Sequence, residues 1–234
     1  MEEVCLNIKL KEDCCDKLYV EVTCHKGDRQ ATAIIQRAHT NFVYEAVGGE
    51  VMLDKRMKGG EEEGNDDIEL NMKLVWDFAT TTPIDELSFI LQTKEYNLKA
   101  ARESRKGNYG HCLGKTMDRP LSHGIFGNSI FSHIISATAS ACDARMGGAL
   151  IPVMSNSGSG NQGICATNPV AVYAEENENT EEELTRALIL SHLTAIYIKQ
   201  SLGKLSALCG CVVASIGSSC GITYLMGGNY SDVC

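Results

Sequence analysis

The N-terminal part of the chain alternates apolar with polar residues, a pattern that predicts short β-strands separated by turns. We expect strands at Val4–Leu10, Leu18–Cys24, Thr32–Ala38, Val43–Val47 and Val51–Leu53. Gly27 lies between the second and third of these segments, and Gly48-Gly49 lies between the last two, so each pair should form a hairpin. The pattern therefore predicts an antiparallel sheet. The charged segment Lys55–Asp67 that follows is expected to be a loop.

Apolar residues recur at helical spacing from Ile68 onward. A first helix should end at Thr80–Thr82, and Pro83 should open an amphipathic, half-exposed helix that runs to about Arg105. The turn-rich segment Gly107–Pro120 then suggests a boundary between an α+β domain, residues 1–110, and an apolar helical domain, residues 111–234. The predicted fold class is α+β, with an antiparallel sheet and helices in the first half and a buried helical bundle in the second.

The second half of the chain carries almost no charge. Its apolar runs predict a buried helix at Ile125–Arg145, a short helix near Pro169–Ala174 and a further helix behind the capping box that begins at Thr180. Asp143 and Arg145 are the only charged residues between positions 121 and 174. Such residues are costly in apolar surroundings unless they are paired. A structural salt bridge and an arginine that receives a substrate carboxylate are the two explanations.

The segment Leu205–Ser231 contains no charged residue and is long enough to be considered as a membrane span. Its many Gly, Ser and Cys residues favour a helix packed tightly inside the protein instead. We expect Leu205–Leu225 to form a central, buried helix. The large side chains of Val212 and Ile216 in its middle should then be shielded from solvent in the full-length fold, whereas in this chain alone a partner chain would be needed to cover them.

The segment Ile151–Ile164 is the most distinctive part of the sequence, with six Ser or Gly residues and three carboxamides. Glycine allows positive φ and close approach, successive N–H groups can hold an anion, and Ser and Asn add neutral hydrogen-bonding groups. A flexible connection is the alternative, which the charge-poor segments on both sides disfavour. The candidate substrate-binding residues are Ser155, Asn156, Ser157, Gly158, Ser159, Gly160, Asn161 and Gln162.

Composition narrows the classes of function. The 234 residues, 44% hydrophobic and 22% charged, are ordinary for a globular protein with a real core. A net charge of −9 disfavours nucleic acid and anionic membranes as partners. No signal peptide is recognisable in the first twenty or so residues, which mix charged with apolar positions, so a cytoplasmic protein is expected.

The eleven cysteines are an unusual number. In a reducing compartment, an odd number at irregular spacing, without a CxxC or HExxH motif, indicates buried thiols or metal ligation more than disulfides. Cys209 and Cys211 would point to different faces of a helix, so one metal would need further ligands from elsewhere. We expect the remaining cysteines to lie in unrelated elements.

Several runs of residues resemble one known family. They are Ala38–Asn41, Met146–Gly148, Met154–Gly163 and Lys204–Val212. Together they resemble the iron–sulfur L-cysteine desulfidase family, relatives of the α chain of iron–sulfur L-serine dehydratase. The resemblance covers essentially the whole chain, although the family's proteins are longer and the chain corresponds to their middle.

The resemblance implies β-elimination on L-cysteine or L-serine at a [4Fe–4S] cluster, giving pyruvate and ammonia, with sulfide from cysteine. It implies that one iron acts as a Lewis acid, that Asn156–Gly160 holds the substrate carboxylate, and that Cys209 or Cys211 is the first cluster ligand. The family's N-terminal Gly-Cys-Thr-Glu-Pro element, with the proposed base, and its two later cluster cysteines have no counterpart here. The chain alone is therefore expected to lack both the base and the cluster.

Two classes of function follow. The first is the core of an amino-acid lyase that works with the absent segments, present in the same chain or supplied by a complementary one. The second is a non-catalytic domain of the same fold that binds small anions or serves assembly. The expected partners are the amino-acid substrate, those segments and, as a further option, a second copy of the chain.

Overall fold

The computed structural model describes residues 5–14, 16, 18–37, 41–56, 68–203, 206 and 208–234, with the backbone alone for positions 120, 121 and 123. The chain divides into two compact units, Met1–Asp66 and Asp67–Cys234. This division differs from the expected boundary near residue 110, because the helices between residues 72 and 106 pack on the later helices. The expected loop at 57–67 and residues 38–40 of the family motif lie outside the described residues.

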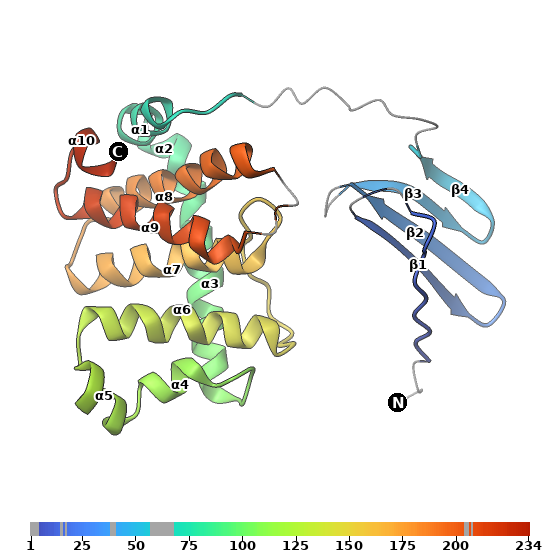
Figure 1. Ribbon diagram of the computed structural model, residues 1–234, viewed down its shortest axis with the longest axis horizontal. Coiled ribbons are helices and arrows are strands. Elements are labelled where there is room, and N and C mark those ends of the chain that lie inside the picture. Colours follow the sequence, from blue (N-terminus) through green and yellow to red (C-terminus); the bar gives the residue numbers. More distant parts are fainter. Residues whose placement is uncertain are drawn as a thin grey trace. The chain divides into compact units, whose positions relative to one another are not determined.

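The first unit is a four-stranded antiparallel sheet whose strands pair in sequence order (Figure 1). Its strands are β1 Tyr19–Lys26, β2 Arg29–Gln36, β3 Phe42–Val47 and β4 Glu50–Asp54. The two predicted hairpins are confirmed. The turn at Gly27 and the turn at Gly48-Gly49 have positive φ values of 58°, 60° and 89°, which explains the glycines. The sheet buries Ile34 and Val43.

The prediction of a strand at Val4–Leu10 is wrong for the described residues 5–10, which form no strand. Leu6 and Ile8 there are 78% and 82% exposed. Alternation alone does not make a strand, because the backbone N–H and C=O groups also need a partner. In the part of the chain that the structure describes, β1 pairs on one side only, with β2.

The second unit is helical (Figure 1). Helix α6 lies beside α7, α7 packs against α8 and α9, and α3 crosses α6 and α7. The elements are α1 Met72–Thr81, α2 Ile84–Leu87, the 3₁₀ turn η1 Ser88–Ile90, α3 Leu91–Lys106, α4 Leu113–Met117, α5 Pro120–Phe126, α6 Ile130–Met146, α7 Gly160–Glu176, α8 Glu181–Leu202, α9 Gly210–Leu225 and α10 Tyr230–Val233.

Local sequence explains several helix ends. The Thr180 hydroxyl accepts a hydrogen bond from Glu183 N–H and the Glu183 carboxylate accepts one from Thr180 N–H, so the predicted capping box is confirmed. The amphipathic helix predicted from Pro83 exists as α2, η1 and α3 in succession. Ile125 belongs to α5 and is exposed, so α6 begins later than the sequence predicted.

Helix α7 is the largest departure from the predicted helices. A short helix was expected near Pro169, but α7 runs for 17 residues and holds Pro169 in its interior. Proline disfavours a helix interior because it removes one hydrogen bond and clashes with the preceding turn. Tertiary packing overrides this local preference here, since most of α7 is buried.

Helix α9 lies on α8 through its smallest residues. A Cβ atom at Gly217 would be 2.3 Å from Ser191 O, and one at Gly221 would be 2.7 Å from Ala187 O. Its buried face is therefore made of Gly, Ala, Ser and Cys together with Val213. The helices come close because these positions carry little or no side chain.

The other face of α9 is exposed in this chain, so these residues alone do not bury the whole helix. Val212 and Ile216 are 50% and 48% exposed. The sequence could not predict which face of α9 packs against the other helices, because apolar residues occur on all sides of this helix. None of the described helices, α9 included, is long and apolar enough to cross a membrane.

Replacement of Gly217 by alanine should destabilise the helical unit by about 1–3 kcal/mol, because the new methyl group would overlap Ser191 O and force α8 away. Urea unfolding followed by circular dichroism measures the change. Gly124→Ala in α5 is the matched control, since a Cβ atom there meets nothing within 4 Å. It should stabilise the protein slightly or leave it unchanged. Equal stability of the Gly217 variant and wild type would contradict the close packing described here.

Candidate functional site

A tight hairpin opens the candidate site. Asn156 N–H donates to Ser159 O at 3.0 Å, and Ser159 N–H donates to Asn156 O at 2.9 Å. Ser157 and Gly158 between them have φ values of 48° and 79°, as a type I′ turn requires. The flexible connection weighed from the sequence is therefore an ordered two-residue turn, and helix α7 follows it directly.

The second half of the predicted loop is the first turn of α7. Ser159 is the N-cap, and its hydroxyl accepts a hydrogen bond from Gln162 N–H at 3.3 Å. Gly160 and Asn161 have no carbonyl four residues earlier in the helix to accept from their N–H groups. These donors and the positive end of the helix dipole favour an anion at this point.

The candidate residues differ in exposure. Asn156, Gly160 and Gln162 are buried, Ser155 and Gly158 are exposed, and Ser157, Ser159 and Asn161 are half-buried. The two buried carboxamides bond to protein groups, so their side chains are structural in part. Main-chain N–H groups of the first turn are thus the better candidates for contact with a ligand.

The segment before the hairpin is clamped between two helices. Asn97 of α3 accepts from Met154 N–H at 2.8 Å and donates to Met154 O at 3.3 Å, as a strand partner would. A Cβ atom at Gly163 would be 2.0 Å from the same Met154 carbonyl. Gly163 is therefore required for α7 to lie against this segment.

Arg145 lies over the start of α7. Its Nη1 donates to Asn161 Oδ1 at 3.0 Å, and a Cβ atom at Gly160 would be 2.3 Å from its Nε. Asp143, two residues earlier, is not its partner: its carboxylate accepts from His111 N–H at 2.9 Å and Leu113 N–H at 2.8 Å. Within the described residues Arg145 has no ion pair, so the salt bridge that the sequence suggested is not formed.

Helix α9 begins beside this turn. A Cβ atom at Gly210 would be 2.9 Å from Gln162 Oε1 and 3.5 Å from Ser159 Oγ. Figure 1 shows the hairpin and the first turn of α9 at the same end of the helical unit. Because Cys209 and Cys211 flank Gly210, the fold brings together the two groups of candidate residues, which are far apart in the sequence.

A buried polar network anchors the hairpin to α8. Asn156 Nδ2 donates to the His192 backbone O and to His192 Nδ1, both at 3.1 Å. Thr167 Oγ1 lies 2.9 Å from His192 Nε2, and Asn97 Nδ2 donates to Thr167 Oγ1 at 3.2 Å. Burial lowers the pKa of His192 to about 4, so its ring is neutral near pH 7. Nδ1 is then the acceptor and Nε2 the donor.

Sequence reasoning missed His192. A single histidine in a largely apolar helix belongs to no motif, and its partners Asn156 and Thr167 come from two other segments of the chain. The sequence carried no local signal that joins this ring to Asn156 and Thr167.

Three cysteines from different helices pack together. Cys142 of α6, Cys165 of α7 and Cys211 of α9 form one cluster around small alanine side chains. This corrects the expectation that the cysteines other than Cys209 and Cys211 lie in unrelated elements. Contact with the Cys165 thiol, and then the Arg145 charge, lower the pKa of Cys142. Contact with Cys142 and burial raise the pKa of Cys165.

The two candidate cluster ligands have different surroundings. Cys209 is exposed, and the backbone N–H and thiol of Cys211 beside its sulfur lower its pKa. Burial raises the pKa of Cys211. Thiolates ligate metals, so Cys209 is the better donor of the two. Among the described residues, no group of three or more His, Cys, Asp or Glu side chains is arranged to hold a metal ion.

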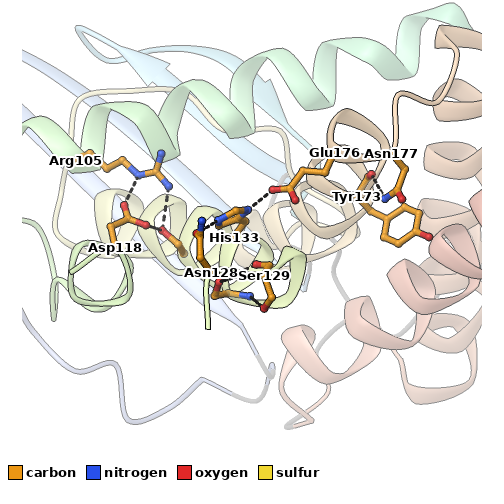
Figure 2. A network of polar contacts seen from close by, with 10 residues as sticks. Arg105, Asp118, Asn128, Ser129, His133, Tyr173, Glu176 and Asn177 are labelled. Atoms are coloured by element: carbon orange, nitrogen blue, oxygen red, sulfur yellow. Dashed lines mark hydrogen bonds and ion pairs between the residues drawn. The ribbon is translucent and has the colours of Figure 1, made fainter. Parts of the chain in front are cut away.

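A second polar region lies near the other end of α7. His133 contacts the Glu176 carboxylate through Nδ1, and Arg105 pairs with Asp118 at 3.1 Å (Figure 2). These side chains and Arg102 line an open cavity of about 480 Å³. Glu176 at its rim is the last of the 17 residues of α7, so roughly 24 Å along the helix separate Glu176 from the first residue of α7 at the hairpin. The charges of the cavity are largely paired with one another, so we take the hairpin end as the candidate site.

Comparison with known proteins identifies the family. The family model described as the serine dehydratase alpha chain matches residues 19–234. The chain belongs to this family, which confirms the serine dehydratase-like class expected from its motifs. No solved structure matches the chain.

Similar curated proteins are bacterial. The chain is 62% identical over 233 residues to UPF0597 protein BF3560 of Bacteroides fragilis, covering 100% of the chain and 54% of that protein. It is 46% identical over 234 residues to a UPF0597 protein of Porphyromonas gingivalis, covering 97% and 54%. It is 42% identical over 219 residues to UPF0597 protein VP2173 of Vibrio parahaemolyticus, covering 93% and 52%. The chain thus spans about half the length of these relatives.

His192 should make the protein less stable in acid. Its pKa is about 4 in the folded state and 6.5 when unfolded, so the unfolded chain binds the extra proton as pH falls through this window. The contribution of His192 to the free energy of unfolding is complete above pH 6.5 and is lost toward pH 4. The free energy of unfolding should fall by about 2–3 kcal/mol between roughly pH 7.5 and 4.5.

Urea unfolding of wild type and His192→Gln at both pH values measures this contribution. The variant should be less stable near pH 7.5 because it disturbs the bonds to Asn156 and Thr167. It should also lose less stability on acidification than wild type does. His25→Gln in the exposed strand β1 is the matched control. An unchanged pH dependence in the His192 variant would show that this ring is not buried as described.

Proposed function

We propose that the full-length protein is an iron–sulfur-dependent lyase that removes the β-substituent of L-cysteine or L-serine, and that this chain supplies the pocket for the substrate. Family membership supports a serine dehydratase-like reaction. The convergence of three features at one place is the observation that carries the proposal. They are the first turn of α7, the Arg145 guanidinium, and the first turn of α9 with Cys209.

The substrate carboxylate would be met by one full positive charge and by neutral dipoles. Arg145 has no ion pair among the described residues, and its Nε lies near Gly160 at the positive end of α7. The N–H groups of Gly160 and Asn161 add donors in a charge-poor region. A carboxylate that leaves water needs both kinds of partner, because a buried charge without hydrogen bonds is strongly disfavoured.

The surroundings of Cys209 fit a cluster ligand. Its thiol is exposed, has a lowered pKa and stands at a helix N-terminus, where a thiolate is favoured. A [4Fe–4S] cluster, when bound, would supply a Lewis-acidic iron for the leaving group and substrate. One suitable thiolate is not a complete ligand set, so the others would come from the half of the relatives' length that this chain does not span.

The chain's own residues would then bind and orient the substrate. Holding the carboxylate at α7 fixes one end of a small amino acid, so that its α- and β-carbons take one position beside Cys209. The neutral His192 ring and the Asn156 amide keep the hairpin in place without adding charge. The proton-abstracting base, like the other cluster ligands, would come from the half of the relatives' length that this chain does not span.

Replacement of Arg145 by methionine in the anaerobically reconstituted full-length protein should raise KM by about ten- to a hundredfold, since a hydrogen bond to a charged group contributes roughly 1.5–3 kcal/mol. Pyruvate formation from L-cysteine and L-serine, with sulfide from L-cysteine, gives the readout. Gly160→Val should act in the same direction, because its side chain would displace the guanidinium.

Two variants test whether the effect is local. Arg102→Met, an exposed arginine of α3 at the distant cavity, should keep wild-type KM. Ser157→Ala should have little effect, because it preserves the main-chain donors. If the folded Arg145→Met and Gly160→Val proteins keep the wild-type KM, the hairpin is not part of the substrate site. Absence of pyruvate from either amino acid with a fully reconstituted cluster would favour a non-catalytic anion-binding or assembly domain.

A further inference from the structure

Gln162 is fully buried, yet its side-chain oxygen Oε1 has no hydrogen-bond partner among the described residues. A buried carbonyl oxygen without a partner loses the hydrogen bond it had in water and is therefore rare in folded proteins. Its presence beside the proposed substrate site calls for a donor. The identity of that donor depends on which way the Gln162 amide points.

The orientation of this amide follows from an obligatory acceptor. The backbone carbonyl of His192 can only accept, so the Asn156 group 3.1 Å from it must be the NH₂. Asn156 Oδ1 therefore points the other way and accepts from Gln162 Nε2 at 2.7 Å. A flipped Gln162 would place two oxygens against each other. The network thus fixes Nε2 toward Asn156 and leaves Oε1 as the group without a donor.

The unpartnered oxygen points to the junction of the two helix starts. A Cβ atom at Gly210 would lie 2.9 Å from Gln162 Oε1, so this buried oxygen lies directly against the first residue of α9. Ser159 Oγ lies near the same point. The oxygen is therefore within the region where α7 presents its free N–H groups and α9 presents Cys209.

We infer that Gln162 Oε1 accepts a hydrogen bond from the α-ammonium group of the amino-acid substrate. This inference rests on the proposed function, and it adds the residue that would distinguish an amino acid from the corresponding acid without nitrogen. An amino-acid substrate whose carboxylate lies at the start of α7 carries its ammonium group on the adjacent α-carbon, only a few bonds away. An ammonium group offers three donors and no acceptor, which suits an oxygen that lacks only a donor.

The charges of the region agree with this assignment. Arg145 faces the start of α7 and suits the carboxylate, whereas an uncharged carbonyl oxygen receives the ammonium. A carboxylate side chain at position 162 would instead have stood against Asn156 Oδ1, because it has no donor to offer when ionised. Glutamine is the residue that bonds Asn156 and still presents an acceptor.

The test compares ligands that differ only in the ammonium group. Binding of L-alanine and of propionate, which have no β-substituent to eliminate, to the reconstituted full-length protein is measured by calorimetry, for wild type and for Gln162→Met. Wild type should bind L-alanine more tightly, and the variant should lose about ten- to a hundredfold for L-alanine alone. Affinity for propionate should change little, because the carboxylate partners are retained.

Gly210→Ala is a second variant that leaves Gln162 intact and places a methyl group against its oxygen. It should cause the same selective loss, and it covers the case in which Gln162→Met does not fold. Asn168→Leu is the matched control, since Asn168 is also a buried α7 carboxamide with an unpartnered oxygen but donates to Ala137 O at 3.3 Å on α6. It should reduce thermal stability without altering discrimination between the ligands.

The outcomes separate this inference from the proposed function. Equal losses for both ligands in Gln162→Met and Gly210→Ala would show a purely structural role and overturn the inference, while the proposed lyase could stand. Equal wild-type affinity for both ligands would overturn it as well. Binding of neither ligand by a wild-type protein with a full complement of iron and sulfide would overturn both proposals together.

Discussion

The hydrogen bonds between the Asn156 amide and His192 hold the rest of the candidate site in place. They join the hairpin to α8, orient the Gln162 amide, and through Thr167 connect to the clamp on Met154. A network in a low-dielectric interior is stable only when its members find partners, and each bond restricts the next. Loss of one member would therefore disturb the hairpin, the start of α7 and the Gln162 oxygen together.

Small residues make this arrangement sterically feasible. Gly163 lets α7 lie on the Met154 segment, Gly210 lets α9 begin against Gln162, and Gly217 brings α9 against α8. In each case a methyl group would meet a neighbouring atom at less than 3.0 Å. The same close packing places Cys142, Cys165 and Cys211 in one cluster. Close packing of the helices in this chain thus needs glycines as much as its turns do.

The candidate site contains more neutral dipoles than formal charges. Arg145 supplies one formal charge, and the remaining partners are helix N–H groups, a neutral histidine and carboxamides. Burial keeps the His192 pKa near 4, so the network does not change its protonation around neutral pH. Dipoles held in fixed positions can meet charge without the cost of bringing a second ion into an apolar region.

The sequence by itself determined the class of fold and the location of the distinctive segment. Alternation gave the four strands of the sheet, turn glycines gave both hairpins, and the capping box gave the start of α8, because these features depend on neighbours only a few residues away.

The tertiary structure decided the rest. Pro169 is inside a helix, Val212 and Ile216 are half exposed, and the Val4–Leu10 segment lacks a strand in its described part, because packing and pairing partners settle each case. The candidate site joins residues from four helices, since Arg145, Gln162 and Gly210 lie close together and His192 is the buried residue that anchors the hairpin. Long-range contacts of this kind produce no periodic pattern in the sequence, so the sequence alone could not predict them.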